Sequence, residues 1–176
     1  MAEVILVDKN DKPIGIMEKL EVHKRALLHR AFSVFIFNSK GEMLLQQRAS
    51  GKYHNPGLWS NTCCSHPKPG ELTGEAAKKR LSEEMGFTTE LDKAFSFTYR
   101  AVFDNGLTEH EYDHVFIGEY NGAVKPDPQE VMNYRYTPLI RIKSELISNP
   151  ENFTEWFKLS FKRVEKFFTD HKNNFS

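Results

Sequence analysis

The alternation of apolar and polar residues predicts paired β-strands in the first third of the chain. Apolar runs at residues 4–7 and 14–17 are separated by turn-forming residues, and the runs at residues 31–37 and 43–47 are separated in the same way. Lys, Asn, Asp, Gly and Pro between such runs favour tight turns. We therefore expect two β-hairpins here.

A second region of alternation lies in the middle of the chain. β-forming residues alternate with polar residues over 95–103 and again over 108–120. The connection contains Asn105-Gly106, a pair that strongly favours a hairpin turn. Antiparallel strands are therefore expected on both sides of this turn.

Helical spacing first appears after residue 72. Ala77, Leu81 and Met85 recur every four residues, Thr73 can accept hydrogen bonds from the first free amides, and Gly86 suits the left-handed residue after the last turn. The pattern predicts a helix over residues 73–85.

The C-terminal region repeats the helical pattern. Residues 151–168 place four apolar side chains on one stripe: Phe153, Phe157, Val164 and Phe168. A shorter helical segment is expected at residues 139–147. The chain shows neither repeats nor a linker rich in Pro, Gly or Ser, so we expect a single α/β (α+β) domain over residues 1–176, with helices covering mixed β-sheets.

Composition narrows the functional classes. The 24 Lys+Arg balance the 24 Asp+Glu, and the pI is about 7.1, so no basic field is available to hold a nucleic acid. A mean hydropathy of −0.56 argues against a membrane span, and 39% hydrophobic residues argue against disorder. The first residues lack a leader pattern, which favours the cytoplasm. We expect a monomer with a small-molecule substrate.

The segment 59–67, Trp-Ser-Asn-Thr-Cys-Cys-Ser-His-Pro, is the richest in chemistry. Cys63 and Cys64 are adjacent, too close for an ordinary disulfide. Strand spacing would place Cys64 and His66 on one face. A buried thiol beside a hydrogen-bonded histidine is the simpler alternative, and this segment alone does not decide between the two.

Two further patterns point to metal or phosphate chemistry. Arg80 and Glu84 share one face of the predicted helix; they form either a solvated ion pair or a site where Arg80 contacts a phosphoryl oxygen and Glu84 holds a divalent cation. Both readings predict an exposed polar face. Alternation also puts Glu109 and Glu111 on one side of a strand, where two carboxylates repel unless a cation or proton lies between them.

Three histidines could join these carboxylates. His23, His29 and His66 would complete a plausible site for manganese, magnesium or zinc, although each histidine taken singly is more often structural. Their spacing matches no compact metal signature, so the residues alone leave the question open.

Together, several segments resemble the type I isopentenyl-diphosphate isomerases, a family with a Nudix-like fold. The resemblance runs from about residue 4 to residue 168 and depends most on the SNTCCSHP segment followed by the helix that carries Glu84. Its other parts are Ala31-Phe32-Ser33, Gln47-Arg48-Ala49, Tyr99-Arg100-Ala101 and Glu109-x-Glu111.

The loop-and-helix motif of Nudix hydrolases is incomplete in this sequence. Aligning Glu83-Glu84-Met85-Gly86 places Glu71 at the first glutamate of the motif, but Ser65 replaces its glycine and Lys79-Arg80 replaces Arg-Glu. One metal carboxylate is therefore missing. Because a hydrolase needs those oxygens to gather ions that activate water, the substitution argues against phosphoanhydride cleavage.

The resemblance implies a role for each matching residue. Cys64 and Glu111 would be the catalytic pair, with Tyr99 and Trp156 in support, and Cys63 would serve packing only. Glu84 would hold Mg²⁺ shared with the substrate diphosphate, and a second divalent metal (Mn²⁺, Mg²⁺ or Zn²⁺) would bind His23, His29, His66, Glu109 and Glu111. The diphosphate would face Lys19, Arg48, Lys52 and Arg80.

The implied reaction converts isopentenyl diphosphate to dimethylallyl diphosphate through a tertiary carbocation. Glu111 would add a proton to the alkene, Cys64 would remove another as thiolate, and Trp156 would offer a π face to the cation. Such a cation needs a pocket without water. The alternatives are a Nudix hydrolase of a nucleoside diphosphate derivative and a catalytically silent Nudix-like binding module.

Overall fold

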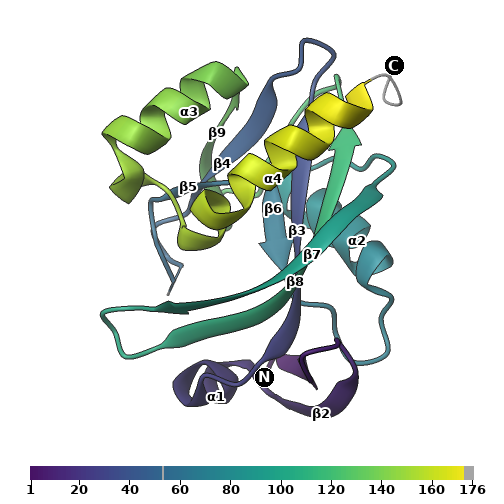
Figure 1. The fold of residues 1–176 in the computed structure, drawn as a ribbon, viewed down its shortest axis with the longest axis vertical. Helices are drawn as coiled ribbons and strands as arrows, with labels where there is room; N and C mark the ends of the chain where they lie inside the picture. The colour runs from purple at the N-terminus through teal and green to yellow at the C-terminus, as the bar shows by residue number, and fades with distance from the viewer. Residues whose placement is uncertain (53, 173–176) are drawn as a thin grey trace.

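A mixed β-sheet forms the centre of the molecule, with helices on both faces (Figure 1). The computed structural model describes residues 1–52 and 54–172. The strands are β1 (Glu3–Val7), β2 (Pro13–Glu18), β3 (His29–Phe37), β4 (Met43–Arg48), β5 (Trp59–Ser60), β6 (Cys63–Ser65), β7 (Asp92–Val102), β8 (Thr108–Glu119) and β9 (Val131–Thr137). The helices are α1 (Lys19–Arg25), α2 (Thr73–Met85), α3 (Leu139–Ser148) and α4 (Glu155–His171), with a short 3-10 helix at Pro150–Asn152.

The strand order confirms the predicted hairpins and adds elements that the sequence pattern did not indicate. β1 pairs with β2, and β7 pairs with β8 across the turn that holds Asn105-Gly106. β3 and β4 are antiparallel but pair only at Phe37 and Met43; farther along the same edge β4 pairs with β5, and its other edge pairs with β9. Helix α1, strands β5 and β9 and the 3-10 helix were not predicted from the sequence.

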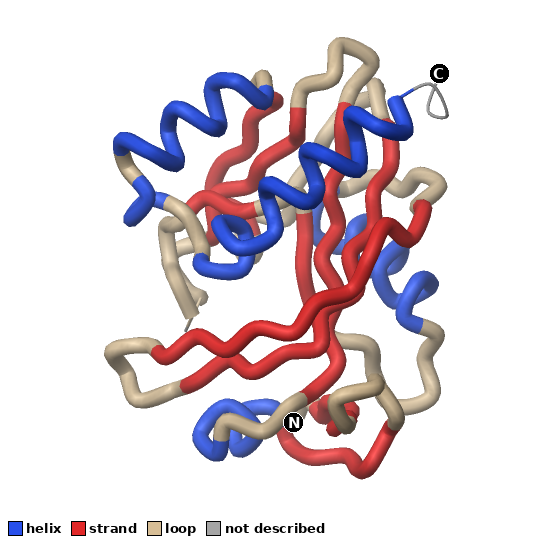
Figure 2. The backbone as a smooth tube through the Cα atoms, in the orientation of Figure 1, coloured by secondary structure: helices blue, strands red, loops and turns tan. Residues whose placement is uncertain are grey.

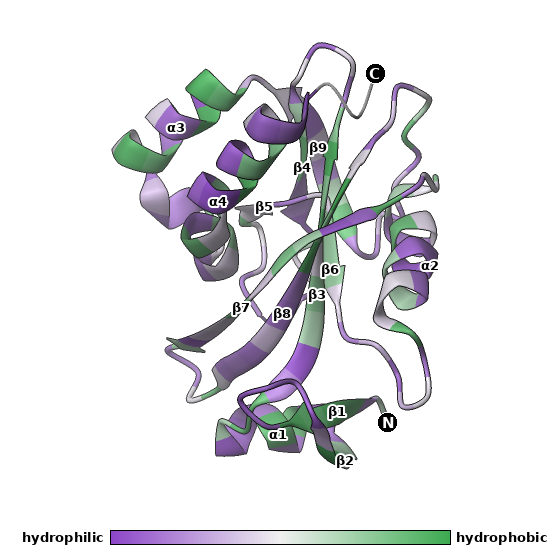
Figure 3. Ribbon diagram, turned by 45° about the vertical axis from the view of Figure 1, so that its right-hand side comes forward, coloured by the Kyte–Doolittle hydropathy of each residue, from purple (hydrophilic) through white to green (hydrophobic). Residues whose placement is uncertain are grey.

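β3 is the organising strand of the sheet. It runs parallel to β8 along its whole length and pairs antiparallel with β6 and, at one position, with β1. Its side chains alternate between two hydrophobic cores: Phe35 and Phe37 point to one face, and Phe32, Val34 and Ile36 point to the other. Hydropathy colouring shows how apolar this central strand is along its middle (Figure 3).

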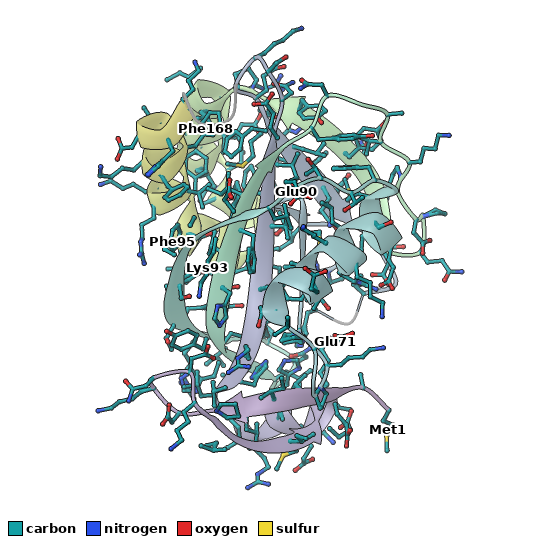
Figure 4. All side chains as sticks on the ribbon, turned by 90° about the vertical axis from the view of Figure 1, so that its right-hand side faces the viewer. Met1, Glu71, Glu90, Lys93, Phe95 and Phe168 are labelled. Atoms are coloured by element: carbon teal, nitrogen blue, oxygen red, sulfur yellow. The ribbon has the colours of Figure 1, made fainter. Side chains whose placement is uncertain are left out.

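The helices close these two cores (Figure 2). Helix α2 covers one face with Ala77, Leu81 and Met85, the stripe that the sequence predicts. On the other face, α3 and α4 cover a core rich in phenylalanine, where the ring of Phe168 stacks on Phe37 with centroids 3.8 Å apart. In Figure 4, Phe168 and Phe95 lie on the side of the sheet opposite α2. Because both cores share β3, the fold is one compact α/β unit, as expected.

The helix ends differ from the prediction in detail. Gly86 ends α2 in the left-handed region (φ 75°), and a Cβ there would lie 2.2 Å from the Lys125 carbonyl oxygen, so glycine is required. Leu72, not Thr73, occupies the N-cap position, and no side chain caps this end. The predicted helix over 151–168 is interrupted at Phe153 and Thr154, whose extended backbone lets the Thr154 amide donate to the carbonyl of Trp59.

The β1–β2 hairpin and helix α1 lie together at one end of the sheet, beside the far end of the β7–β8 hairpin (Figure 1). None of the helices formed by the described residues combines the length and the apolar character that crossing a bilayer requires.

Candidate active site

Strand pairing brings the predicted chemical groups together on neighbouring strands of the sheet. On β8, Glu111 lies directly opposite Tyr99 of β7 and beside His29 of β3. On the other edge of β3, Ser33 lies opposite Cys64 of β6. Four neighbouring strands therefore carry a phenol, a carboxylate, an imidazole and a thiol, and the positions that pair with Glu111 and Cys64 lie four residues apart on β3.

These groups surround one cavity. The empty space within it and at its opening to solvent is about 590 Å³. Its lining residues are Lys19, Phe32, Ser33, Arg48, Lys52, His54, Cys64, Ser65, His66, Arg80, Glu84, Tyr99, Glu109, Glu111 and Trp156. Of the residues proposed from the sequence, His23 and His29 are outside this lining, and they lie behind it. Cys64 and Glu111 face the same space.

Tyr99 bridges the two carboxylates that strand alternation paired. Its hydroxyl oxygen lies 2.7 Å from Glu111 Oε2 and 2.9 Å from Glu109 Oε2. A phenol has one proton, so it can donate to only one of them. If it donates to Glu111, Glu109 must itself carry a proton and donate to Tyr99. In agreement, burial and the neighbouring Glu111 charge raise the pKa of Glu109 to about 8.

Glu111 is the ionised member of the pair. Burial acts to raise its pKa, but hydrogen bonds to His29 and His66 outweigh burial and hold it well below the ordinary value. A third buried carboxyl, Asp113, follows on the same face of β8 and accepts a hydrogen bond from the Ser33 hydroxyl at 2.7 Å. Burial and the charge of Glu111 raise the pKa of Asp113 well above its ordinary value. Of the three buried carboxyl groups, Glu111 is therefore ionised, whereas Glu109 and Asp113 favour their protonated forms.

The histidines and Glu111 form a group that can hold a divalent cation. One ligand atom from each of His23, His29, His66 and Glu111 lies within 4.8 Å of all the others. His66 Nε2 is 3.0 Å from Glu111 Oε1 and 3.2 Å from His29 Nε2, and His29 Nε2 is 3.6 Å from Glu111 Oε1. Bonds of about 2.0–2.2 Å to one metal place neighbouring ligand atoms roughly 3.0–3.5 Å apart, so the donor set and its spacing fit a metal.

Burial prepares these imidazoles for metal binding. It lowers the pKa of His23 to about 3 and that of His66 to about 4, in the second case against a hydrogen bond with Glu111. Both rings are therefore neutral at neutral pH, the form that binds metals.

The two cysteines face opposite sides of the sheet. Cys63 is fully buried in the core under α2, which supports the packing role assigned to it. Cys64 points into the cavity, where burial raises the pKa of its thiol to about 12, although the Arg48 charge acts in the opposite direction. Cys64 is thus a thiol, not a thiolate, in this state of the pocket.

Trp156 is the aromatic residue of α4 that reaches the cavity. Its indole Nε1–H donates to Asn61 Oδ1 at 3.1 Å, and the Asn61 amide is fixed by the carbonyls of Val34 and Cys63. The Arg48 guanidinium lies 5.3 Å from the ring centroid, so the indole face already accepts a cation. Its neighbours Phe153 and Phe157 belong to the core instead.

At the mouth of the cavity, Arg80 and Glu84 meet as their helical spacing predicts. Arg80 Nε donates to Glu84 Oε1 at 2.8 Å, and Gln46 Nε2 donates to the other oxygen at 2.9 Å. The expectation of an exposed polar face was wrong for Glu84, which is 4% exposed. β4 packs over this part of α2, and Gln46 supplies the hydrogen bond that a buried carboxylate needs.

Four cationic residues line the cavity: Lys19, Arg48, Lys52 and Arg80. Glu130, which the sequence did not single out, pairs with Lys52 and lies 3.0 Å from Arg80 Nη2. Burial lowers the pKa of both Lys19 and Lys52, while nearby carboxylates act to raise it. Desolvated cations of this kind bind anionic oxygens strongly.

Three residues that sequence reasoning missed belong to the site: His54, Asn61 and Glu130. Asn61 lies inside the conspicuous segment 59–67, and its neighbours could have drawn attention to it. His54 and Glu130 come from loops without a recognisable pattern, and only their tertiary contacts reveal them.

A NUDIX domain model matches residues 27–157. The isopentenyl-diphosphate Delta-isomerase of Pectobacterium atrosepticum is 50% identical over 173 residues, 98% of this chain and 97% of that protein. The enzyme of the same name from Serratia proteamaculans is 50% identical and covers 88% of this chain and 86% of its own length. The MutT protein from Methanosarcina mazei superimposes with a TM-score of 0.66 at 23% identity, covering 82% of this chain and 96% of its own.

Proposed function

The chain belongs to the NUDIX domain family and, within it, to the isopentenyl-diphosphate Delta-isomerases, and we propose that Cys64 and Glu111 are the two groups that move protons between isopentenyl and dimethylallyl diphosphate. The main supporting observation is that one cavity is lined by both the partly buried thiol of Cys64 and the buried carboxylate of Glu111. The isomerisation adds a proton at one carbon and removes one two carbons away, so it needs one proton donor and one acceptor at the same time.

In this proposal Glu111 adds the proton and Cys64 removes the other, and the roles reverse in the back reaction. The Tyr99 hydroxyl, 2.7 Å from Glu111, can pass on the proton that Glu109 holds. The resting pocket holds the opposite arrangement, with the proton on Cys64 and Glu111 ionised. The forward reaction therefore begins after Glu111 has gained a proton and Cys64 has lost its own; the resting arrangement is the one the back reaction starts from.

Trp156 and the depth of the pocket support the carbocation. The indole face, fixed through Asn61, supplies π electron density but no nucleophile that could capture the cation. Because Tyr99, Glu109, Glu111 and Trp156 are each less than 8% exposed, the reacting end of the cavity excludes bulk water.

The metal assignments divide between the two ends of the cavity. His23, His29, His66 and Glu111, whose ligand atoms converge, would hold one divalent cation, either Mn²⁺, Mg²⁺ or Zn²⁺. Glu109, which lies in a second group with His23 and His54, would join them as the fifth ligand. Glu84 would hold Mg²⁺ together with the substrate diphosphate. Bound there, the first cation would lower the basicity of Glu109 and Glu111. Arg48, Lys52 and Arg80 then bind the diphosphate oxygens, and this binding energy keeps the hydrocarbon end in place.

The test is incubation with isopentenyl diphosphate and Mg²⁺ in deuterated water, followed by ²H and ³¹P NMR of the product. We expect deuterium in the new methyl group and an intact diphosphate. Release of inorganic phosphate would support the hydrolase alternative. Unchanged isopentenyl and dimethylallyl diphosphates would indicate a silent binding module.

A further inference from the structure

A fourth imidazole lies beside the histidine group without belonging to it. His54, in the loop between β4 and β5, is 4% exposed, and its Nε2 lies 3.2 Å from Nδ1 of His23. The two rings meet edge to face, with centroids 4.8 Å apart and planes at 78°. On its other side His54 packs against Phe103, at 5.1 Å between centroids. The position of this ring is thus fixed by neighbours from two other elements.

We propose that His54 is a positioning residue for His23: it accepts the Nδ1–H of His23 and thereby holds His23 in the tautomer whose Nε2 carries a lone pair for the metal. This inference relies on the metal site of the proposed function. It concerns a hydrogen bond between two neutral rings and assigns His54 no contact with the metal.

The reasoning follows from the number of protons available. Two neutral ring nitrogens 3.2 Å apart share one proton between them. If His54 donated it, neutral His23 would keep its own proton on Nε2, and Nε2 could not bind a cation. If His23 donates from Nδ1, the neutral ring keeps its lone pair on Nε2. Only the second arrangement is compatible with metal binding through Nε2.

The tautomer of His29 is set in the same way, by a neighbour that can only accept a hydrogen bond. The Nδ1 of His29 lies 2.9 Å from the carbonyl oxygen of Leu27, which can only accept, so with a metal bound His29 Nε2 would offer its lone pair to the cation beside His66 and Glu111. Metal-binding histidines generally donate their second ring N–H to such an acceptor. In our proposal His54 does for His23 what the Leu27 carbonyl does for His29.

Direct ligation by His54 is the competing interpretation. His54, His23 and Glu109 do form a second group with ligand atoms within 4.8 Å of one another. However, His54 is not part of the group formed by His23, His29, His66 and Glu111, where the larger number of ligand atoms converge. We therefore place His54 behind His23.

The experiment measures Zn²⁺ affinity by competition with a chelator, in the full chain and without isoprenoid substrate. His54→Leu removes the acceptor and should weaken Zn²⁺ binding about 10–100-fold, the usual effect of losing such a partner. His54→Gln keeps an oxygen that can accept and should recover most of this loss. His114→Leu is the matched control: His114 is equally buried but bonds to Asp11 outside the cluster, so Zn²⁺ affinity should be unchanged.

A second readout needs no variant. Long-range ¹H–¹⁵N NMR of the Zn²⁺-loaded wild-type protein should show His23 protonated at Nδ1. A proton on Nε2 would overturn the proposal, as would His54→Leu with wild-type affinity or His54→Gln no better than His54→Leu. Loss of one imidazole ligand in X-ray absorption of His54→Gln would make His54 a direct ligand, and would also overturn it. None of these outcomes bears on whether the protein isomerises its substrate.

Discussion

The two ends of the cavity balance charge in different ways. At the proton-transfer end, Glu109, Glu111 and Tyr99 are buried on paired strands, and their charges are balanced by shared protons and hydrogen bonds. At the mouth, Arg80 and Lys52 come from a helix and a loop and are balanced by ion pairs with Glu84 and Glu130. Backbone pairing between β7 and β8 holds the groups at the proton-transfer end in place. The groups at the mouth are held by side-chain ion pairs between α2 and two loops.

This difference suggests how each end meets its ligand. Partly exposed ion pairs contribute little to stability, so an incoming anion can replace Glu130 on Lys52 and Arg80 at small cost. The buried network cannot exchange partners in this way, because an unpaired group there would cost several times more. Substitutions at the mouth should therefore change substrate binding, and those at the proton-transfer end should change the chemical step.

The largest effect is expected at the proton-transfer end. Cys64→Ala or Glu111→Gln removes one of the two proton-transfer groups, and general acid–base catalysis contributes roughly 10²–10⁴-fold to rates. We expect kcat to fall by at least this much while circular dichroism shows a folded protein. NMR assay of dimethylallyl diphosphate formation gives the rate.

Cys63→Ala is the matched control for Cys64→Ala. It removes the adjacent thiol, which lies on the opposite face of the sheet in the core under α2. We expect some loss of stability, because a small cavity forms, but near-normal turnover. Near-normal isomerisation by Cys64→Ala or Glu111→Gln would refute the proposed pair.

A smaller effect of a different kind is expected at the mouth. Arg80→Ala should raise KM about 10–100-fold, because a hydrogen bond to a charged group contributes about 1.5–3 kcal/mol. The value of kcat should change much less. Lys79→Ala is the neighbouring control, since Lys79 is exposed and absent from the cavity lining. A wild-type KM in Arg80→Ala would remove Arg80 from the diphosphate site.

The pH dependence of stability tests the buried network without substrate. Burial lowers the pKa of His23, His54 and His66 to about 3, 4 and 4, below the value of about 6.5 in an unfolded chain. As pH falls below about 6.5, the unfolded state binds protons that the folded state does not. The free energy of unfolding then decreases, by at most about 1.4 kcal/mol per pH unit for each histidine.

Glu109 acts in the opposite direction. Its pKa of about 8 in the folded state exceeds the unfolded value, so its contribution falls as pH rises from about 4.5 to about 8. Asp113, whose pKa is also raised by burial, acts in the same direction. Urea unfolding of the metal-free protein should therefore show greatest stability at about pH 6.5, with a loss on both sides. Equal stability at pH 5 and pH 6.5 would contradict the burial of neutral histidines.

The sequence could predict contacts between residues that are close together in one strand or helix. Local patterns placed Glu109 beside Glu111 and Arg80 beside Glu84, because strand and helix periodicities fix neighbours two or four residues apart. The hairpin at Asn105-Gly106 was likewise local. A resemblance to known enzymes, not periodicity, was needed to associate His29 with Glu111.

The missing information concerns contacts between remote segments. The parallel register of β3 and β8 puts His29 beside Glu111, and no turn residue between the two strands indicates such a pairing. Glu84 is buried only because Gln46 of another strand reaches it. Glu130 meets Arg80 from a loop fifty residues farther along the chain, as the numbering shows. These contacts depend on packing of the whole fold.

The smallest predicted effect is also the one that separates the two ends most clearly. Glu130→Gln removes the carboxylate that pairs with Lys52 and Arg80 but leaves both cations in place. If an arriving diphosphate must displace Glu130, its neutralisation should lower KM, by up to about fivefold for a pair of 0.2–1 kcal/mol. Loss of Arg80 and loss of its partner would then shift KM in opposite directions, with kcat little changed in both. A raised KM in Glu130→Gln would mean instead that Glu130 holds the cations in their binding positions, so that the mouth is as fixed in place as the proton-transfer end.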